Sequence, residues 1–453
     1  MKNLLPPIEK VQSSKFKVQS FLYFCSMIIN EATWYFVREH ADEDVRKVAL
    51  LGTKDPEVDL HVALEQIAGR HTARRKLPSW AAVDGIVYPP HLNMEQCSSE
   101  QTARYKASLA LRSACGKRGV FVDLTGGFGV DFYWMSQGFQ KRQYIEQNAA
   151  LCEIAENNFR KLGLECSVCC CDTATYLTTM PHASLVYLDP ARRNDQGGRT
   201  YGIEDCTPNV LELMPRLLEK ADRVMLKLSP MLDWRKAVDD IEQLRANSQG
   251  PVANVHEVHI VSVDNECKEL LLVLGKEHVD SLRVLCMNGD SSFEFIPKVG
   301  MLCSQAGNES FPRWEYSFCS DLVDSPLYLY EPNASIMKAG CFAEVEERFR
   351  VQQIAMNSHL FLSSVEMDEF PGRKFQILAI SSMNKQELKR VFKEIINQKL
   401  TSMESANIAV RNFPMTVDQL RKKLKMKDGG DTYIFATTLA SGEHKLLICR
   451  KIG

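Results

Sequence analysis

Hydrophobic and polar residues follow two different spacings along the chain. In the first part, apolar and charged positions recur at helical spacing over residues 21–40 and 42–69, with an interruption at residues 51–53. The prolines within residues 78–90 break this pattern, and we expect an extended stretch there. Residues 1–98 are therefore predicted to form an N-terminal helical domain.

Short apolar runs then alternate with amphipathic segments. The predicted strands of this part are residues 119–124, 143–146, 166–171, 184–188 and 223–227. Such alternation is typical of an α/β domain in which helices cover both faces of a parallel sheet. Two closing strands, residues 257–263 and 269–274, are separated by a short loop and are expected to pair as an antiparallel hairpin. We place this domain at residues 99–276.

The remaining chain divides into two parts. Residues 277–370 form a connecting region that is strand-rich and irregular to about Tyr330, with a helical pattern over residues 332–348. Residues 371–453 read as a small α+β domain. Its predicted strands are residues 375–380, 407–411, 432–438 and 445–449, and its predicted helices are residues 385–397 and 417–425.

Composition excludes several classes of protein. A chain of 453 residues exceeds one ordinary core, so two or three domains are expected. The net charge of −2 gives no overall attraction to nucleic acid, so any basic surface must be local. No apolar run has the length of a signal peptide or a bilayer span, which predicts a cytoplasmic protein without membrane contact. The 15 cysteines are then expected to be reduced thiols.

Three glycines lie between the first predicted strand of the α/β domain and the next helix: Gly126, Gly127 and Gly129. Such glycines let the backbone approach a ligand and direct the N–H groups of the helix start toward it. Their spacing lacks the G-x-G-x-x-G register of dinucleotide sites. Asp123, at the strand end before them, suits a cationic ligand and would repel a pyrophosphate. The turn therefore predicts a site for a positively charged cofactor.

Two more acids follow the next two strands. Glu146 ends the second strand and can bond a ribose diol of either kind of nucleoside cofactor. Asp172 follows the third strand, where its side chain can reach an adenine amino group. For any one of these residues, a solvated acid at an ordinary strand–turn–helix is a competing interpretation. Four features in the expected order favour a cofactor site.

These residues resemble the motifs of class I S-adenosylmethionine-dependent methyltransferases, the seven-stranded Rossmann-like group. Residues 123–129 look like their first motif, Glu146 like their second-strand acid and Asp172 like their adenine-binding acid. Residues 189–192, Asp-Pro-Ala-Arg, look like their fourth motif. The resemblance covers roughly residues 100–275 and implies this fold and S-adenosylmethionine as the cofactor.

The whole chain resembles, more narrowly, bacterial proteins in which this catalytic domain precedes a C-terminal THUMP-like domain. The segments that carry this resemblance are residues 331–340 and 421–431. THUMP domains of RNA-modifying enzymes bind structured RNA, so the resemblance implies an RNA methyltransferase. By analogy, the candidate cofactor contacts are Gln101, Thr102, Asp123, Thr125, Gly126, Gly127, Gly129, Glu146, Gln147 and Asp172.

The candidate catalytic residues are Asp189, Pro190, Ala191 and Arg192. They follow an apolar strand and should lie at the carboxyl edge of the sheet. The lone pair of an exocyclic base nitrogen is delocalised into the ring, which makes the nitrogen a poor nucleophile. A carboxylate such as Asp189, with the carbonyl of Pro190 or Ala191, can accept its two N–H bonds and aim the lone pair at the methyl group.

The fourth position departs from the usual pattern, in which an aromatic residue stacks on the base. Arg192 can stack through its guanidinium, but together with Arg193 and Arg199 it can equally bind phosphates. The acceptor atom therefore stays open. Carbon methylation, which needs a cysteine nucleophile, ranks lower because Cys206 is the one candidate near this motif.

Two other clusters have simpler interpretations. The cysteines within residues 166–171 alternate between strand faces and cannot all reach one ion, so we expect no metal. Residues 405–453 carry 9 Lys and Arg against 4 acids, which favours contact with nucleic acid over a merely solvated face. The candidate RNA contacts there are Arg421, Lys422, Lys423, Lys425 and Lys427. A second basic run occupies residues 70–76.

Three functions remain in competition. We expect a methyltransferase that modifies a base nitrogen of structured RNA, rRNA or tRNA, with no obligate protein partner. The alternative is a small-molecule or protein methyltransferase whose N-terminal helices cap a closed pocket. A non-catalytic cofactor-binding module is the third.

Overall fold

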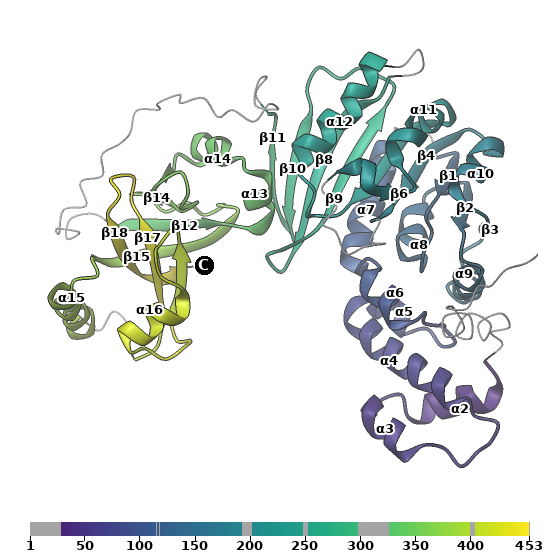
Figure 1. The fold of residues 1–453 in the computed structure, drawn as a ribbon, viewed down its shortest axis with the longest axis horizontal. Helices are drawn as coiled ribbons and strands as arrows, with labels where there is room; N and C mark the ends of the chain where they lie inside the picture. Colours follow the sequence, from purple (N-terminus) through teal and green to yellow (C-terminus); the bar gives the residue numbers. More distant parts are fainter. Residues whose placement is uncertain are drawn as a thin grey trace, which may run out of the picture. The chain divides into compact units, whose positions relative to one another are not determined.

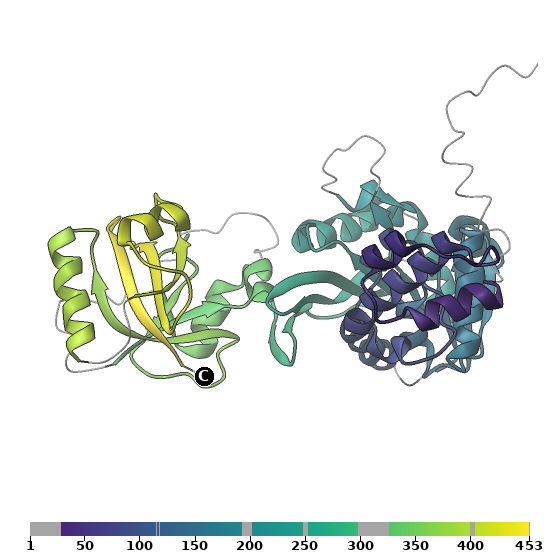
Figure 2. The same ribbon diagram turned by 90° about the horizontal axis from the view of Figure 1, so that it is seen from below.

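The computed structural model describes most of the chain, and Figures 1 and 2 show it in two views. The described residues are 29–114, 116, 118–192, 202–247, 252–297, 326–398 and 404–452. They form two units. The first holds the described residues up to Leu228 together with Lys236–His256 and Leu272–Val279, and the second holds Ser229–Arg235, Glu257–Leu271 and the described residues from Asp280 onward.

The first sheet has nine strands in the order β11-β10-β8-β9-β7-β4-β1-β2-β3. Its parallel strands are β1 (Val120–Asp123), β2 (Lys141–Glu146), β3 (Ser167–Cys170), β4 (Ala183–Leu188) and β7 (Ala221–Leu228). All six residues of β4 are buried, as expected for a central strand covered on both faces. The strand order confirms the predicted Rossmann-like sheet and brings the carboxyl ends of β1, β2, β4 and β7 to one edge.

The predicted hairpin forms and lies next to β7 in this sheet. Strands β8 (Asn254–Val263) and β9 (Glu266–Gly275) are neighbours joined by Asp264 and Asn265, both with positive φ, the pattern of a tight hairpin turn. Two further strands, β10 (Arg283–Asn288) and β11 (Ser291–Phe295), extend the sheet beyond the seven that the sequence predicts.

The N-terminal helices lie together as one group, drawn purple to blue in Figures 1 and 2. They are α2 (Glu31–Glu39), α3 (Val45–Leu51), α4 (Leu60–Lys76), α5 (Pro78–Ala81) and α6 (His91–Gln96), followed by α7 (Glu100–Ser113). Gly52, with a φ of +66°, ends α3 at the expected interruption. The expectation of an extended stretch from Pro78 is wrong in part, because proline at the first helical position starts α5.

Helices also follow the strands of the first sheet. They are α8 (Val130–Ser136), α9 (Ala149–Lys161), α10 (Thr173–Thr179), α11 (Val210–Lys220) and α12 (Trp234–Asn247). Helix α9 packs on β2 and β3, and α11 packs on β7. Helix α7, which precedes β1, packs against α8.

The second unit contains a seven-stranded sheet in the order β13-β14-β12-β15-β18-β17-β16. Its strands are β12 (Leu327–Pro332), β13 (Gln352–Gln353), β14 (Phe361–Ser363), β15 (Gly372–Ser381), β16 (Asn407–Arg411), β17 (Thr432–Thr438) and β18 (His444–Ile452). Its helices are α13 (Ala334–Ala339), α14 (Phe342–Phe349), α15 (Lys385–Asn397) and α16 (Val417–Leu424). Strands β12 to β14, which lie in the predicted connecting region, thus share a sheet with the C-terminal strands.

No helix in the described ranges is both long and apolar enough to cross a bilayer. Within the same residues, no group of three His, Cys, Asp or Glu side chains could hold a metal ion.

Candidate active site

The glycine turn after β1 is shaped by close packing. A Cβ atom on Gly126 would lie 2.1 Å from Cε2 of Tyr144, and one on Gly129 would lie 2.6 Å from Cζ of Phe159. Gly127 and Gly129 also have positive φ values of +58° and +87°, which side chains rarely adopt. These glycines therefore let the turn lie directly on the aromatic residues of β2 and α9.

Asp123 lies at the carboxyl end of β1 and is 1% exposed. Its Oδ1 accepts the N–H of Thr125 at 2.9 Å. Burial raises the pKa of Asp123 well above its ordinary value, and the nearby carboxylates of Asp131 and Asp189 add to the rise. A cationic group beside Asp123 would relieve this, so the residue fits the positively charged methionine end of the predicted cofactor.

Glu146 fixes the glycine turn to β2. One carboxylate oxygen accepts the N–H of Gly127 at 2.9 Å, and the other accepts the N–H of Asn148 at 2.8 Å. The hydroxyl of Tyr144 donates to the carbonyl oxygen of Gly127 at 2.5 Å. Glu146 is half-buried and keeps lone pairs for a ribose, whereas Gln147 beside it is exposed.

The other predicted cofactor residues have structural roles of their own. Asp172 is exposed and caps α10, where it accepts the N–H of Thr175 at 2.9 Å and its hydroxyl at 2.5 Å. These hydrogen bonds hold the pKa of Asp172 below its ordinary value. Thr102 is buried and donates to the carbonyl of Ser99 at 3.2 Å, while Gln101 is exposed. Their contacts with a cofactor stay predictions.

The fourth motif begins directly after β4. The N–H of Asp189 donates to Oγ1 of Thr125 at 2.6 Å, which joins the motif to the glycine turn. Pro190 is buried, and Ala191–Arg192 form the short strand β5. This strand pairs with β6 (Cys206–Thr207). The described residues thus bring the candidate catalytic acid and the glycine turn together.

The arginines of this region are described only in part. The structure describes the backbone of Arg192, but its side chain lies outside the described residues, as do Arg193 and Arg199. Cys206 is 2% exposed and lies opposite Arg192 in the two-stranded ladder.

Sequence reasoning missed Lys227, at the end of β7. Its Nζ bonds Oδ2 of Asp189 and lies 3.9 Å from Oδ2 of Asp131 in α8. Burial raises the pKa of Asp189, and Lys227 opposes the rise. A lysine on the strand next to β4, at the same sheet edge, was the signal available in the sequence.

Asp131 is the centre of this group of buried charges. Lys106 of α7 is fully buried, and its Nζ lies 3.0 Å from Oδ1 of Asp131. The hydroxyls of Ser98 and Tyr187 donate to Oδ2 of Asp131, each at 2.8 Å. Burial alone would raise the pKa of Asp131, but the two lysines and the two hydroxyls hold it below its ordinary value.

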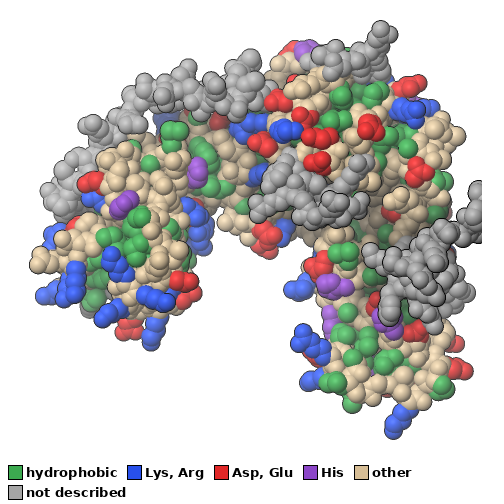
Figure 3. All heavy atoms as spheres, viewed as in Figure 1, with side chains coloured by type: hydrophobic (Ala, Val, Ile, Leu, Met, Phe, Trp, Pro, Cys, Tyr) green, Lys and Arg blue, Asp and Glu red, His purple; other side chains and the backbone are tan. Residues whose placement is uncertain are grey.

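The predicted RNA contacts of the second unit differ in their availability. Arg421 pairs with Asp428 at 2.6 Å and donates to the carbonyl of Ala406 at 3.2 Å, so it stabilises the fold of its own domain. The exposed residues are Lys422, Lys423, Lys425 and Lys427. Figure 3 shows Lys and Arg side chains gathered over α15 and α16. The sequence interpretation omitted the exposed lysines of α15, which are Lys385, Lys389 and Lys393.

Two known domain families match the C-terminal part of the chain. Residues 372–451 match the family described as THUMP domain-like, and residues 328–371 match a ferredoxin-like domain family. A solved protein from Porphyromonas gingivalis W83 that carries a methyltransferase assignment is 28% identical. The match covers 93% of this chain and 98% of that one, with a TM-score of 0.74. The chain is a methyltransferase that ends in a THUMP-like domain.

More distant structures resemble part of this methyltransferase. A protein from Pyrococcus horikoshii assigned as an RNA methyltransferase is 13% identical over 46% of this chain and 100% of its own, with a TM-score of 0.32. An rRNA methylase from Streptococcus thermophilus is 12% identical over 39% of this chain and 96% of its own, with a TM-score of 0.28. Neither likeness supports a substrate. No curated protein sequence matches the chain significantly.

Replacing Asp123 with asparagine is expected to stabilise the cofactor-free methyltransferase near neutral pH. Because the folded-state pKa is raised, ionising this carboxyl costs free energy in the folded protein. That cost grows as the pH rises from the unfolded-state pKa through the folded-state pKa. The free energy of unfolding of D123N, measured by urea denaturation, should therefore exceed that of the wild type at neutral pH and approach it in acid.

D172N is the matched control, because Asp172 is exposed and asparagine caps a helix as well as aspartate. It should show no gain in stability at neutral pH. If D123N and the wild type unfold at the same urea concentration at every pH, the assignment of a strained buried carboxyl is wrong.

Proposed function

We propose that this methyltransferase transfers a methyl group from S-adenosylmethionine to a base nitrogen of structured RNA, rRNA or tRNA. The position of Asp189 carries the proposal. Its N–H is bonded to Thr125 of the glycine turn, so the acid that would hold the acceptor stands beside the turn that would hold the cofactor.

Different residues at this edge of the sheet would bind the cofactor and the acceptor. S-adenosylmethionine supplies an electrophilic methyl group when it is bound. Asp123 and Glu146 are placed to hold the methionine end and the ribose. Lys227 engages Oδ2 of Asp189, and none of the described residues donates a hydrogen bond to Oδ1. Oδ1 can thus accept an N–H of the acceptor, while the carbonyl of Pro190 or Ala191 accepts the second.

The second unit supports RNA as the acceptor. Its THUMP-like match spans residues 372–451, and the exposed lysines at the end of α16 suit a phosphate backbone. These lysines include Lys422 and Lys423, for which the described residues provide no ion pair. A small-molecule or protein acceptor remains the alternative, and no observation among the described residues favours it.

Methyl transfer from tritiated S-adenosylmethionine to separate RNA, protein and metabolite fractions of a bacterial extract tests the proposal. Label should enter the RNA fraction, and Asp189→Ala should abolish transfer while S-adenosylmethionine affinity is retained. Hydrolysis of the labelled RNA to nucleosides then tests for a methylated base. Label confined to protein or metabolites would refute the RNA assignment, and full transfer by the Asp189 variant would refute the catalytic assignment.

Removing the amine of Lys227 should slow transfer through its effect on Asp189. In Lys227→Met the carboxyl loses its buried cation, so the pKa of Asp189 rises further and the carboxylate form is reached at higher pH. We expect the acid limb of the pH–rate profile to move to higher pH, with S-adenosylmethionine affinity little changed. Lys236→Met, which removes a half-exposed lysine paired with Asp240, is the matched control. An unshifted profile for Lys227→Met would show that Lys227 does not act on Asp189.

A further inference from the structure

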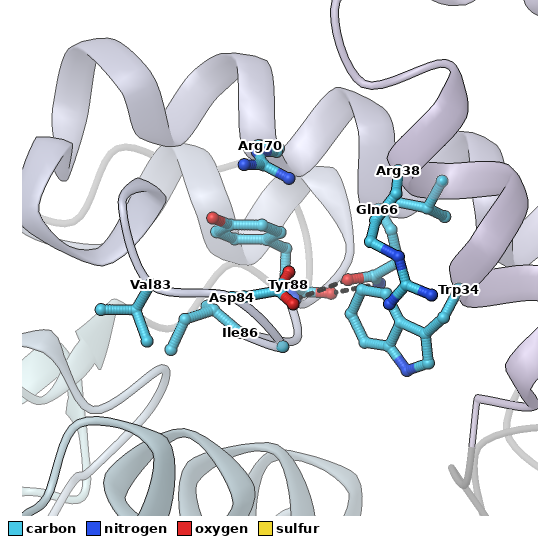
Figure 4. A pocket seen from close by; sticks show the side chains of 10 residues that line it. Trp34, Arg38, Gln66, Arg70, Val83, Asp84, Ile86 and Tyr88 are labelled. Carbon is cyan, nitrogen blue, oxygen red and sulfur yellow. Dashed lines mark hydrogen bonds between the residues drawn. The ribbon is translucent and has the colours of Figure 1, made fainter.

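A hollow in the N-terminal helical domain is lined by charged and aromatic side chains. It lies between α2, α4 and the loop before α6, and the space of about 300 Å³ between its walls includes open solvent, so it is a shallow surface hollow and not an enclosed cavity. Figure 4 shows Arg70 above the ring of Tyr88, and Arg38 beside Trp34. These four side chains belong to no part of the active site described above.

The floor of the hollow is held rigidly against α4. The side chain of Gln66 accepts the N–H of Tyr88 at 2.8 Å and donates to its carbonyl at 3.0 Å. Gly69 allows this close approach, because a Cβ there would lie 2.4 Å from Cβ of Tyr88. The position of the Tyr88 ring is therefore fixed before any ligand arrives.

The same loop is attached to the catalytic domain. The side chain of Asn158, in α9, accepts the N–H of Val87 and donates to its carbonyl, each at 2.8 Å. The ring of Tyr88 lies 6.5 Å from that of Phe128, which belongs to the glycine turn. The hollow and the cofactor turn thus belong to one unit and share this contact.

Both arginines of the hollow lack an acidic partner among the residues that the structure describes. Arg38 is exposed. Nε of Arg70 is shielded from solvent, and no described group accepts a hydrogen bond from it. Asp84 is the one acid among the lining residues, so two positive charges face one negative charge. This cationic excess suits an anion that carries several acceptor oxygens.

Two other cations of the basic run at residues 70–76 have partners within the domain. Arg74 pairs with Asp42, and the Nζ of Lys76 donates to the carbonyl of Met94 at 2.9 Å. Burial raises the pKa of the Tyr88 hydroxyl to about 12, although Arg70 opposes the rise, so Tyr88 stays neutral at physiological pH. Its ring lies beneath Arg70 and supports the position of that guanidinium group.

We propose that this hollow binds one nucleotide of the RNA, with its phosphate on Arg38 and Arg70 and its base against Trp34. The inference rests on the proposed function, since it assumes an RNA substrate. Planar guanidinium groups match phosphate geometry, and aromatic rings accept any base by stacking. A half-buried tryptophan on the same helix as Arg38 provides such a ring one helical turn away. The N-terminal domain thereby holds the RNA strand in a fixed position relative to the active site.

The test uses the full-length protein and a fluorescently labelled single-stranded oligoribonucleotide of mixed sequence, with anisotropy measured across salt concentrations. The variant replaces Arg38 and Arg70 with methionine. The slope of log affinity against log salt should fall in magnitude by about 0.7, because both arginines contact the same phosphate and each phosphate contact on a single strand contributes about 0.7. Arg46→Met, an exposed arginine of α3 outside the hollow, is the matched control and should keep the wild-type slope.

Trp34→Ala tests the base. Loss of a stacked base should weaken binding about fivefold or more without changing the salt slope. If the arginine variant is weak but Trp34→Ala binds like the wild type, the hollow holds a phosphate only and the nucleotide assignment is wrong. Thermal unfolding of each variant checks folding, and Arg38→Met alone, at an exposed position, replaces the double variant if that one unfolds.

The outcomes separate this inference from the proposed function. If the wild type binds neither this oligoribonucleotide nor a folded RNA such as tRNA at low salt, the RNA assignment fails and the inference fails with it. If the wild type binds RNA and the arginine variant binds equally with the same slope, the hollow is not an RNA site, and the proposed function stands.

Discussion

The buried ion pair between Lys106 and Asp131 is the constraint on which the active site depends. Lys106 is completely buried, and an unpaired charge in such a place costs several kcal/mol. Helix α7 can therefore dock on α8 only where Asp131 meets the lysine. Because Asp131 also accepts a hydrogen bond from Tyr187 on β4 and lies beside Lys227 on β7, that docking fixes the two strands that carry the candidate transfer site.

Two buried carboxylates of the site, Asp123 and Asp131, have pKa values shifted in opposite directions. Asp131 has cationic and hydroxyl partners and a lowered pKa, whereas Asp123 accepts hydrogen bonds only from Thr125 among the described residues, has no cationic partner there and has a raised pKa. Asp189 has one cationic partner, because Lys227 bonds its Oδ2, and burial still raises its pKa. A cationic cofactor beside Asp123 would stabilise its ionised form and lower its pKa. A site held ready in this way lowers the stability of the ligand-free protein, which is a familiar cost of function.

Local sequence patterns predicted the strands of the catalytic domain and its first and fourth motifs. The glycines and the apolar runs are short-range signals, so they could be found without knowledge of the fold. The charge network could not, because Lys106, Asp131 and Lys227 are distant in sequence and meet only through the strand order. Asp172 shows the opposite problem, since an acid before a short helix looks the same whether it caps the helix or binds adenine.

The basic residues divide in a way that composition could not reveal. Arg421 and Arg74 lie in runs that look uniformly solvated in the sequence, yet each pairs with an acid of its own domain. Arg70 belongs to one of these runs and faces a hollow instead. Whether a cation is available to RNA thus depends on which carboxylates lie near it in the folded protein. The spacing of charges along the chain does not contain that information.

The most direct test of the account is calorimetric titration of the full-length protein with S-adenosylmethionine between about pH 5 and pH 7. Because the cofactor's positive charge is expected to face Asp123, binding should favour the ionised carboxyl, release protons and strengthen as the pH rises toward neutrality. Buffers with different ionisation enthalpies report the released protons. D123N should bind weakly with no proton release. Wild-type binding that is independent of pH, or equally tight binding by D123N, would contradict the central claim that Asp123 is the acid that receives the cofactor.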